Sequence, residues 1–230
     1  MDRERTRVET LPPDGRPKGA FTLAEFFDAA VSFHRRGQHR QAEDMYRTVL
    51  GAVPAHLGAL HNLGILCSQT ARAAEAIEHL RAAAAGDPRS AGIHCDLGIA
   101  LAALGRAEEA IAEYEKAIAL EPRRIDSHNN LGNTLLALKR PEQAIAHFER
   151  ALAIRPNAPA VHNNLANALV EANRLDDAVA HYRKALEIRP DFAEACNNLG
   201  MVLVKLGCRE AAIENSRWRS RISHDMATLT

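Results

Sequence analysis

Aromatic residues are scarce in this chain of 230 residues, and neither sign of charge dominates it. Phe, Trp and Tyr make up 4 % of the sequence, so the alternation of β-branched and aromatic residues that is typical of β-strands is missing. Lys plus Arg and Asp plus Glu each number 29, which leaves no excess of cations to neutralise nucleic-acid phosphates. Apolar residues nevertheless make up 47 %, which excludes disorder over the whole length.

Long apolar runs and closely spaced cysteines are lacking too. No stretch of about 18 uncharged apolar residues is present, so we expect no membrane-spanning helix. The first residues, MDRERTRVET, carry charges where a secretory signal has an apolar run. The cysteines form no Cys-x-x-Cys pair and predict no disulfide framework. We therefore expect a protein of the reducing cytoplasm, with neither a membrane nor a nucleic acid as its partner.

Motifs of catalysis and of metal binding are likewise missing. The chain has no Gly-rich phosphate loop, no Gly-x-Ser-x-Gly and no His-Glu-x-x-His. His94, Cys95 and Asp96 are consecutive, but successive helical residues point about 100° apart and cannot all face one ion. Cys67 takes an apolar core position and is expected to be inert. Two further sets of histidines recur at a fixed register and are expected to be surface or packing residues: His128 and His162, and His79, His147 and His181. We expect no enzyme, no cofactor and no metal site.

The sequence does contain an internal repeat of 34 residues. At this spacing recur a proline, a Leu followed by a small residue, an alanine and a large side chain, and so many columns with one period exclude coincidence. The prolines are Pro54, Pro88, Pro122, Pro156 and Pro190, and the small residues after Leu are Gly64, Gly98, Gly132, Ala166 and Gly200. The alanines are Ala42, Ala76, Ala110, Ala144, Ala178 and Ala212, and the large side chains are Tyr46, Leu80, Tyr114, Phe148 and Tyr182.

Each repeat predicts two helices. In the repeat at 125–158, the first helix is expected from about Ile125 to Leu138. The second begins near Pro141, since proline suits the first helical turn, and it ends near Ile154, before Pro156. The small residue after each Leu predicts a close approach of the two helices, and the large side chains are expected to fill the gap between consecutive repeats. No single pair can bury its apolar stripe, so stability depends on stacking.

The period and these columns resemble the tetratricopeptide repeat family. The resemblance implies an all-α fold, an α-solenoid of antiparallel helix pairs that forms a right-handed superhelix. The array is expected over 21–214, with repeats at 23–56, 57–90, 91–124, 125–158 and 159–192 and a partial repeat at 193–214. Residues 1–20 mix charges with Pro and Gly and predict a disordered tail. Residues 215–230 are interpreted as a capping helix or a frayed tail.

Asparagine is concentrated in the first helices of the later repeats, although it is a poor helix former. Repeats four to six read HNNLGN, HNNLAN and CNNLGM. Offsets of one and four place these side chains on one helical face, and stacking aligns them along the array. The candidate site residues are Asn129, Asn130, Asn133, Asn163, Asn164, Asn167, Asn197 and Asn198, with Asn62 and Asp96 at an equivalent position in earlier repeats.

Two interpretations of these amides stay open. In the first, they tie neighbouring first helices together or cap local backbone. In the second, they form a ladder on the concave face, whose donors and acceptors pair with the backbone of an extended peptide. The earlier repeats are expected to receive apolar side chains of the partner instead, on Phe27, Val31, Ile65 and Ile99. A clamp for a terminal carboxylate is disfavoured, because the groove-facing positions of the first helices carry no Lys or Arg.

The leading prediction is a non-enzymatic scaffold or adaptor that binds a peptide or a partner protein in its groove. Two alternatives remain. The doubled Asn beside His resembles the repeat arm of the O-linked N-acetylglucosamine transferases, where such a ladder holds the substrate polypeptide. That resemblance implies a substrate-recognition arm without its catalytic domain. Exposed ends of a solenoid can also stack on one another, which would make the chain a self-associating structural module.

Overall fold

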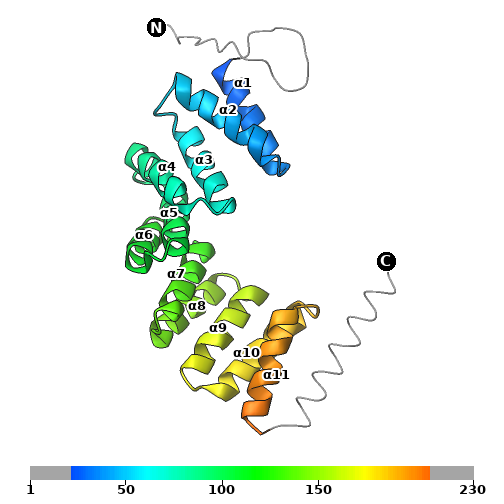
Figure 1. Cartoon of the computed structure of the whole chain (residues 1–230). Coiled ribbons are helices and arrows are strands. Elements are labelled where there is room, and N and C mark those ends of the chain that lie inside the picture. Colours follow the sequence, from blue (N-terminus) through cyan, green and yellow to red (C-terminus); the bar gives the residue numbers. More distant parts are fainter. Residues whose placement is uncertain (1–21, 208–230) are drawn as a thin grey trace, which may run out of the picture. The chain divides into compact units, whose positions relative to one another are not determined.

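The computed structural model describes residues 22–207, and the regular structure in this range consists of α-helices (Figure 1). The expected N-terminal tail, the end of the partial repeat and the segment 215–230 lie outside the described residues. The helices are α1 (Leu23–Arg35), α2 (His39–Ala52), α3 (Leu57–Gln69), α4 (Ala73–Gly86), α5 (Ala91–Ala103), α6 (Ala107–Leu120), α7 (Ile125–Ala137), α8 (Pro141–Ile154), α9 (Pro159–Glu171), α10 (Leu175–Ile188) and α11 (Ala193–Lys205). Each is too short or too polar to span a lipid bilayer. The all-α prediction is confirmed.

Local sequence signals place the ends of these helices. Thr22 caps α1, because its hydroxyl accepts a hydrogen bond from the Glu25 backbone while the Glu25 carboxylate accepts one from the Thr22 backbone at 2.8 Å. Pro141 occupies the first turn of α8, as predicted. The first helix of that repeat, α7, ends at Ala137, one residue before the expected end.

The turn inside each helix pair needs one residue in the left-handed conformation. The residues concerned have φ between 58° and 78° and are Gly37, Ala71, Gly105, Lys139, Asn173 and Gly207. Glycine adopts this conformation without strain, whereas a side chain with a Cβ costs about 1–2 kcal/mol there. Ala71 and Lys139 are therefore strained positions of the scaffold.

The chain divides inside α6, between Glu113 and Tyr114, into two compact units. In the first unit α1 packs on α2 and α3 on α4, and each second helix also packs on the first helix that follows it. The second unit repeats this scheme, with α7 on α8, α9 on α10, and α8 and α10 on the next first helices. Neighbouring first helices also contact one another, as α7 does α9 and α9 does α11.

In repeats two and four, the small residue after Leu allows the close approach inside a pair, as predicted. A Cβ added to Gly64 would lie 2.6 Å from Cγ of Leu80, and one added to Gly132 would lie 2.6 Å from Cε1 of Phe148. The large side chains thus pack on the small residue of their own pair. We expected them between consecutive repeats, but these contacts place Leu80 and Phe148 between the two helices of one repeat.

Candidate functional site

The second unit contains a groove of about 550 Å³, within the range of roughly 300–1,000 Å³ that is usual for ligand sites. It is lined by Asn133, Leu136 and Ala137 of α7, by Lys139 of the turn after α7, by Asn167, Val170 and Glu171 of α9, by Tyr182 of α10, and by Asn198, Met201, Val202 and Lys205 of α11. On each first helix these residues follow the spacing of three and four that defines one helical face. Because α7, α9 and α11 contact in sequence, the three faces form one continuous surface.

The apolar part of this surface is open to solvent. Met201, which lines the groove from α11, is 65 % exposed. Leu136 and Val170 add half-buried apolar surface from the other two first helices. The groove can therefore bury apolar side chains of a ligand.

Several of the predicted asparagines connect first helices to one another. Asn164 donates from Nδ2 to Oδ1 of Asn129 at 3.0 Å, which links α9 to α7. Asn198 donates from Nδ2 to Oδ1 of Asn163 at 3.3 Å and of Asn167 at 3.1 Å, which links α11 to α9. These contacts support the interpretation that the amides tie neighbouring repeats.

Asn163 is the clearest structural residue of this group. Its side chain is 1 % exposed, so it does not reach the groove. Its Nδ2 donates to the Glu194 carboxylate at 2.9 Å, while its Oδ1 accepts from Asn198. The amide thus both donates to and accepts from α11, and it links α9 to that helix.

Asn167 serves the scaffold and the groove with different atoms. Its Oδ1 accepts from the Tyr182 hydroxyl at 2.5 Å and from Asn198 at 3.1 Å, which occupies both lone pairs. Burial raises the pKa of Tyr182 far above its ordinary value, so the hydroxyl stays protonated as a donor. The Nδ2 of Asn167 has no partner among the described residues. It is a donor held in a fixed orientation at the groove.

The other predicted amides are placed differently. Asn133 is exposed in the groove and forms no hydrogen bond with a described residue. Four more lie outside the lining of the groove, namely Asn129, Asn130, Asn164 and Asn197. Asn62 donates to the Gly58 carbonyl of its own helix at 2.9 Å. The structure therefore brings together Asn133, Asn167 and Asn198 as groove residues.

A link of one kind recurs between neighbouring first helices. In the first unit, Nε2 of His61 lies 2.7 Å from Oδ2 of Asp96. This pair is separated by 35 residues, as are Asn129 and Asn164 and also Asn163 and Asn198. Asp96 thus corresponds to the tying amides of the second unit, and its carboxylate is engaged with an imidazole.

The predicted apolar residues of the first unit are partly used in packing. The Phe27 ring lies 4.9 Å from the His56 ring, and a Cβ on Gly58 would come within 2.7 Å of its Cζ, so it packs on the start of α3. Val31 and Ile65 are half-buried. Ile99 is 39 % exposed and is the most open of the four.

Two lysines of the groove were not predicted from the sequence. Lys139 donates to the Glu171 carboxylate at 3.0 Å, across the rim, and Lys205 lines the end of the groove on α11. Lys205 of α11 contradicts the expectation that the groove-facing positions of the first helices carry no Lys or Arg, whereas Lys139 lies outside those positions, in the turn after α7. The sequence could have indicated Lys139, because its place in the 34-residue period is that of the turn between the two helices of a repeat.

Histidine pairs inside single repeats were also missed. His128 and His147 face each other with their Nδ1 atoms 3.2 Å apart, and His162 and His181 do so at 3.0 Å. In each pair the first histidine donates from Nε2 to a proline carbonyl in the preceding loop, which can only accept. Burial lowers the pKa of both His147 and His181, and the charge of the facing histidine lowers it further. The pairs fasten the loop to the second helix, a packing role.

Comparison with known proteins identifies the repeat. Two models of the tetratricopeptide repeat match the chain, one over residues 27–91 and the other over 89–157 and 123–191. None of the curated protein sequences matches it. Among solved structures, PilF of Pseudomonas aeruginosa is 24 % identical with a TM-score of 0.74, covering 87 % of this chain and 91 % of that one.

Two other solved structures show the same fold. A MamA protein is 26 % identical with a TM-score of 0.66, covering 75 % of this chain and 94 % of that one. A thermophilic tetratricopeptide-repeat protein of Thermus thermophilus is 24 % identical with a TM-score of 0.64, covering 80 % and 100 %. A special closeness to the arms of the O-linked N-acetylglucosamine transferases is not shown by these comparisons.

Proposed function

Since this chain belongs to the tetratricopeptide repeat family, we propose that it is a non-enzymatic scaffold that binds an extended segment of a partner protein. The fold alone does not define the partner, so the proposal depends on the groove of the second unit. Its main support is the combination of amide donors, of which that of Asn167 is held in a fixed orientation, with exposed apolar surface. Asn133 and Asn167 offer N–H groups beside Leu136 and Met201.

Amide donors at this position suit the backbone carbonyls of an extended peptide. Every residue carries such a carbonyl, so the donors bind without selecting side chains, and each hydrogen bond contributes about 0.5–1.5 kcal/mol. Apolar side chains of the same peptide can cover Val170 and Met201. Because the amides bind the backbone and the apolar surface binds side chains, we expect the groove to bind many different peptides, with a preference for those that present apolar residues.

The charges at the rim add a second preference. Glu171 neutralises Lys139 through their ion pair. Lys205 forms no ion pair with a residue in the described range, so it adds a net positive charge to the end of α11. A peptide with an acidic residue at that end is expected to bind best.

The test uses an array of immobilised 12-residue peptides of unrelated sequence, probed with the purified full-length chain. Peptides that bind are then titrated in solution against the wild type and Asn133→Ala. Asn133 makes no hydrogen bond with a described residue, so its removal leaves the scaffold intact. Loss of one hydrogen bond should raise Kd by about 2- to 12-fold.

Asn129→Ala is the matched control. Like Asn133→Ala it removes an asparagine side chain from α7, but Asn129 lies outside the groove. It should leave Kd unchanged while lowering stability slightly through the lost bond with Asn164. Methylation of the peptide backbone nitrogens should be tolerated at the residues whose carbonyls meet Asn133. Equal affinity of the wild type and Asn133→Ala for every binding peptide would contradict the proposed backbone recognition.

A further inference from the structure

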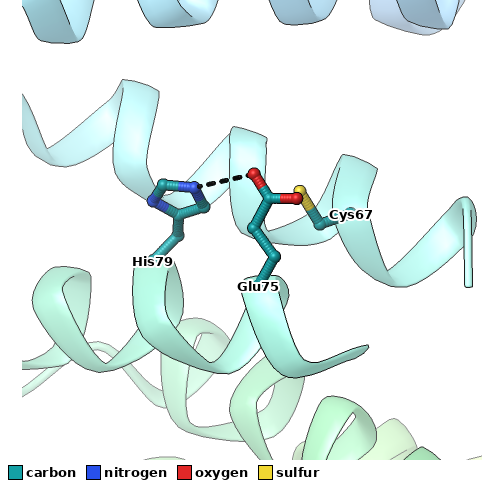
Figure 2. A group of neighbouring side chains, drawn as sticks. All are labelled: Cys67, Glu75 and His79. Carbon is teal, nitrogen blue, oxygen red and sulfur yellow. Dashed lines mark ion pairs between the residues drawn. The ribbon is translucent and has the colours of Figure 1, made fainter. Parts of the chain in front are cut away.

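A cluster of three different metal-binding side chains lies in the first unit, between the two helices of repeat two (Figure 2). Cys67 of α3 faces Glu75 and His79 of α4, and one ligand atom of each lies within 4.8 Å of the others. Cys67 is fully buried, while the side chains of His79 and Glu75 are 21 % and 29 % exposed. We propose that these three residues form a binding site for a divalent transition-metal ion, with zinc as the best match.

The donor set is one that zinc prefers. Zinc binds cysteine sulfur, imidazole nitrogen and carboxylate oxygen at about 2.0–2.3 Å in tetrahedral geometry, which separates the ligand atoms by roughly 3.3–3.8 Å. The present separations of up to 4.8 Å therefore need a contraction of about 1 Å. Side-chain rotation supplies such a change without moving either helix. Three protein ligands leave the fourth position open to water or to an exogenous ligand.

His79 is already oriented for this role. Its Nε2 is buried, lies 3.7 Å from Oε1 of Glu75, and has no hydrogen bond with a described residue. The equivalent residues of repeats four and five, His147 and His181, pair instead with a histidine of the first helix. Repeat two has Leu60 at the position of that histidine, so His79 lacks this alternative partner. A buried polar atom without a hydrogen bond is costly, and a bound cation would satisfy it.

The thiol is specific to this repeat. The position of Cys67 is occupied in the other repeats by Phe33, Leu101, Leu135, Leu169 and Leu203. Repeat five has Asp177 and His181 at the positions of Glu75 and His79 but Leu169 in place of the thiol. The complete donor set thus occurs only where cysteine replaces the larger apolar residue, at the expense of core packing.

The Cys67 thiol is buried in the core, at the apolar position predicted from the sequence. Burial, with a smaller effect of Glu75, raises the pKa of Cys67 to about 11. A metal ion must therefore displace the thiol proton, so its affinity should increase with pH.

Two arginines compete with the metal for Glu75. Arg47 contacts Oε1, and Arg72 donates to Oε2 at 3.0 Å. Both also pair with Glu43, at 2.9 Å and 2.7 Å, and these contacts hold the pKa of Glu43 at about 2. A metal that takes Oε1 displaces Arg47 from Glu75 but leaves it paired with Glu43. Arg47→Gln is therefore expected to raise metal affinity.

The test titrates the reduced full-length chain with Co²⁺ and then with Zn²⁺ as a competitor. Cobalt bound by a thiolate gives a sulfur-to-metal charge-transfer band in the near ultraviolet, and one equivalent should saturate it. Cys67→Leu copies the residue of the other repeats and should abolish the band. His79→Gln should weaken cobalt binding by about 10- to 100-fold or more.

Cys196→Ala is the matched control, because it removes another buried thiol and leaves the cluster intact. It should keep the band and the stoichiometry of the wild type. Helicity measured by circular dichroism confirms that each variant is folded. Absence of the band in the wild type, or its persistence in Cys67→Leu or at undiminished affinity in His79→Gln, would overturn the assignment.

Discussion

Replacing His147 by glutamate should reverse the effect of acid on the stability that repeat four contributes. The Nδ1 atoms of His128 and His147 lie 3.2 Å apart. Repeat three carries the proposed substitution naturally, since Nδ1 of His94 lies 2.6 Å from a carboxylate oxygen of Glu113 at the equivalent position. His147→Glu therefore copies a geometry that this fold already accommodates.

The sign follows from proton linkage. In the wild type, Nε2 of His128 donates to the Pro122 carbonyl, so the two facing Nδ1 atoms share a single proton when one imidazole is charged. Burial lowers the pKa of His147, and the charges of His128 and Arg150 lower it further. The unfolded state then binds more protons than the folded state, and stability is lost as the pH falls below the unfolded value of about 6.5. In the variant, the carboxylate favours the charged His128, so acid stabilises the folded state instead.

The magnitude is bounded by one proton per site. A single group changes stability by at most about 1.4 kcal/mol per pH unit. Between pH 7.5 and 5.5, only the pH unit below 6.5 contributes, so each histidine pair of the wild type loses at most about 1.4 kcal/mol and both lose at most about 2.8 kcal/mol. The variant removes one of these losses, and by the same bound the charged hydrogen bond adds at most about 1.4 kcal/mol between pH 7.5 and 6.5. We therefore compare the free energy of unfolding of the variant with that of the wild type at each pH. This difference should favour the variant by about 1–3 kcal/mol more at pH 5.5 than at pH 7.5.

Urea unfolding followed by circular dichroism at the two pH values measures this difference directly. Ala146→Glu is the control, because it adds the same charge to an exposed position of the same helix without facing His128. It should shift stability equally at both pH values. If His147→Glu responded to pH as Ala146→Glu does, the proton sharing inferred for the pair would be refuted.

Three further predictions about the scaffold can be tested by urea unfolding. Ala71→Gly relieves the left-handed strain at φ 58° and should raise the free energy of unfolding by about 0.5–1 kcal/mol, whereas Gly105→Ala should lower it; the opposite order would contradict the strain argument. Tyr182→Phe copies Phe148 and removes only the bond to Asn167, so it should cost about 1 kcal/mol, and a cost near zero would mean that this bond is not made. Asn163→Ala leaves Glu194 and Asn198 without their buried partner and should lower the free energy of unfolding by about 1–3 kcal/mol. Asn133→Ala should lower it by almost nothing. Equal losses would show that Asn163 does not link α9 to α11.

The repeat period was sufficient to predict the helices because each signal acts locally. Pro141 begins a helix through its own missing N–H, and Pro156 follows the end of the same helix at Ile154 because proline cannot continue it. Contacts between different columns carry no such signal. His128 and His147 are 19 residues apart, and Asn167 and Tyr182 are 15 apart. Comparing one position across repeats cannot show which two columns face each other inside a helix pair.

The placement of the asparagines on one helical face was too coarse for the same reason. An offset of four residues rotates a side chain by about 40° around the helix. That rotation separates Asn163, which α11 covers through Glu194 and Asn198, from Asn167, which reaches the groove. Only the position of the next helix decides which of the two is buried, and that position depends on packing between repeats.

The two interpretations of the amides, as links between neighbouring helices and as donors for a peptide, apply to different atoms of the Asn167 side chain. Tyr182 and Asn198 occupy both lone pairs of the Asn167 oxygen, so this oxygen cannot accept a hydrogen bond from a peptide N–H. The same two bonds fix the orientation of the Nδ2 donor before a ligand arrives, which reduces the entropy that binding must overcome. Asn133 has neither constraint and can rotate its amide to present donor or acceptor. Under the proposed binding mode, a peptide therefore meets Asn167 through a carbonyl, whereas Asn133 can meet either a carbonyl or an N–H.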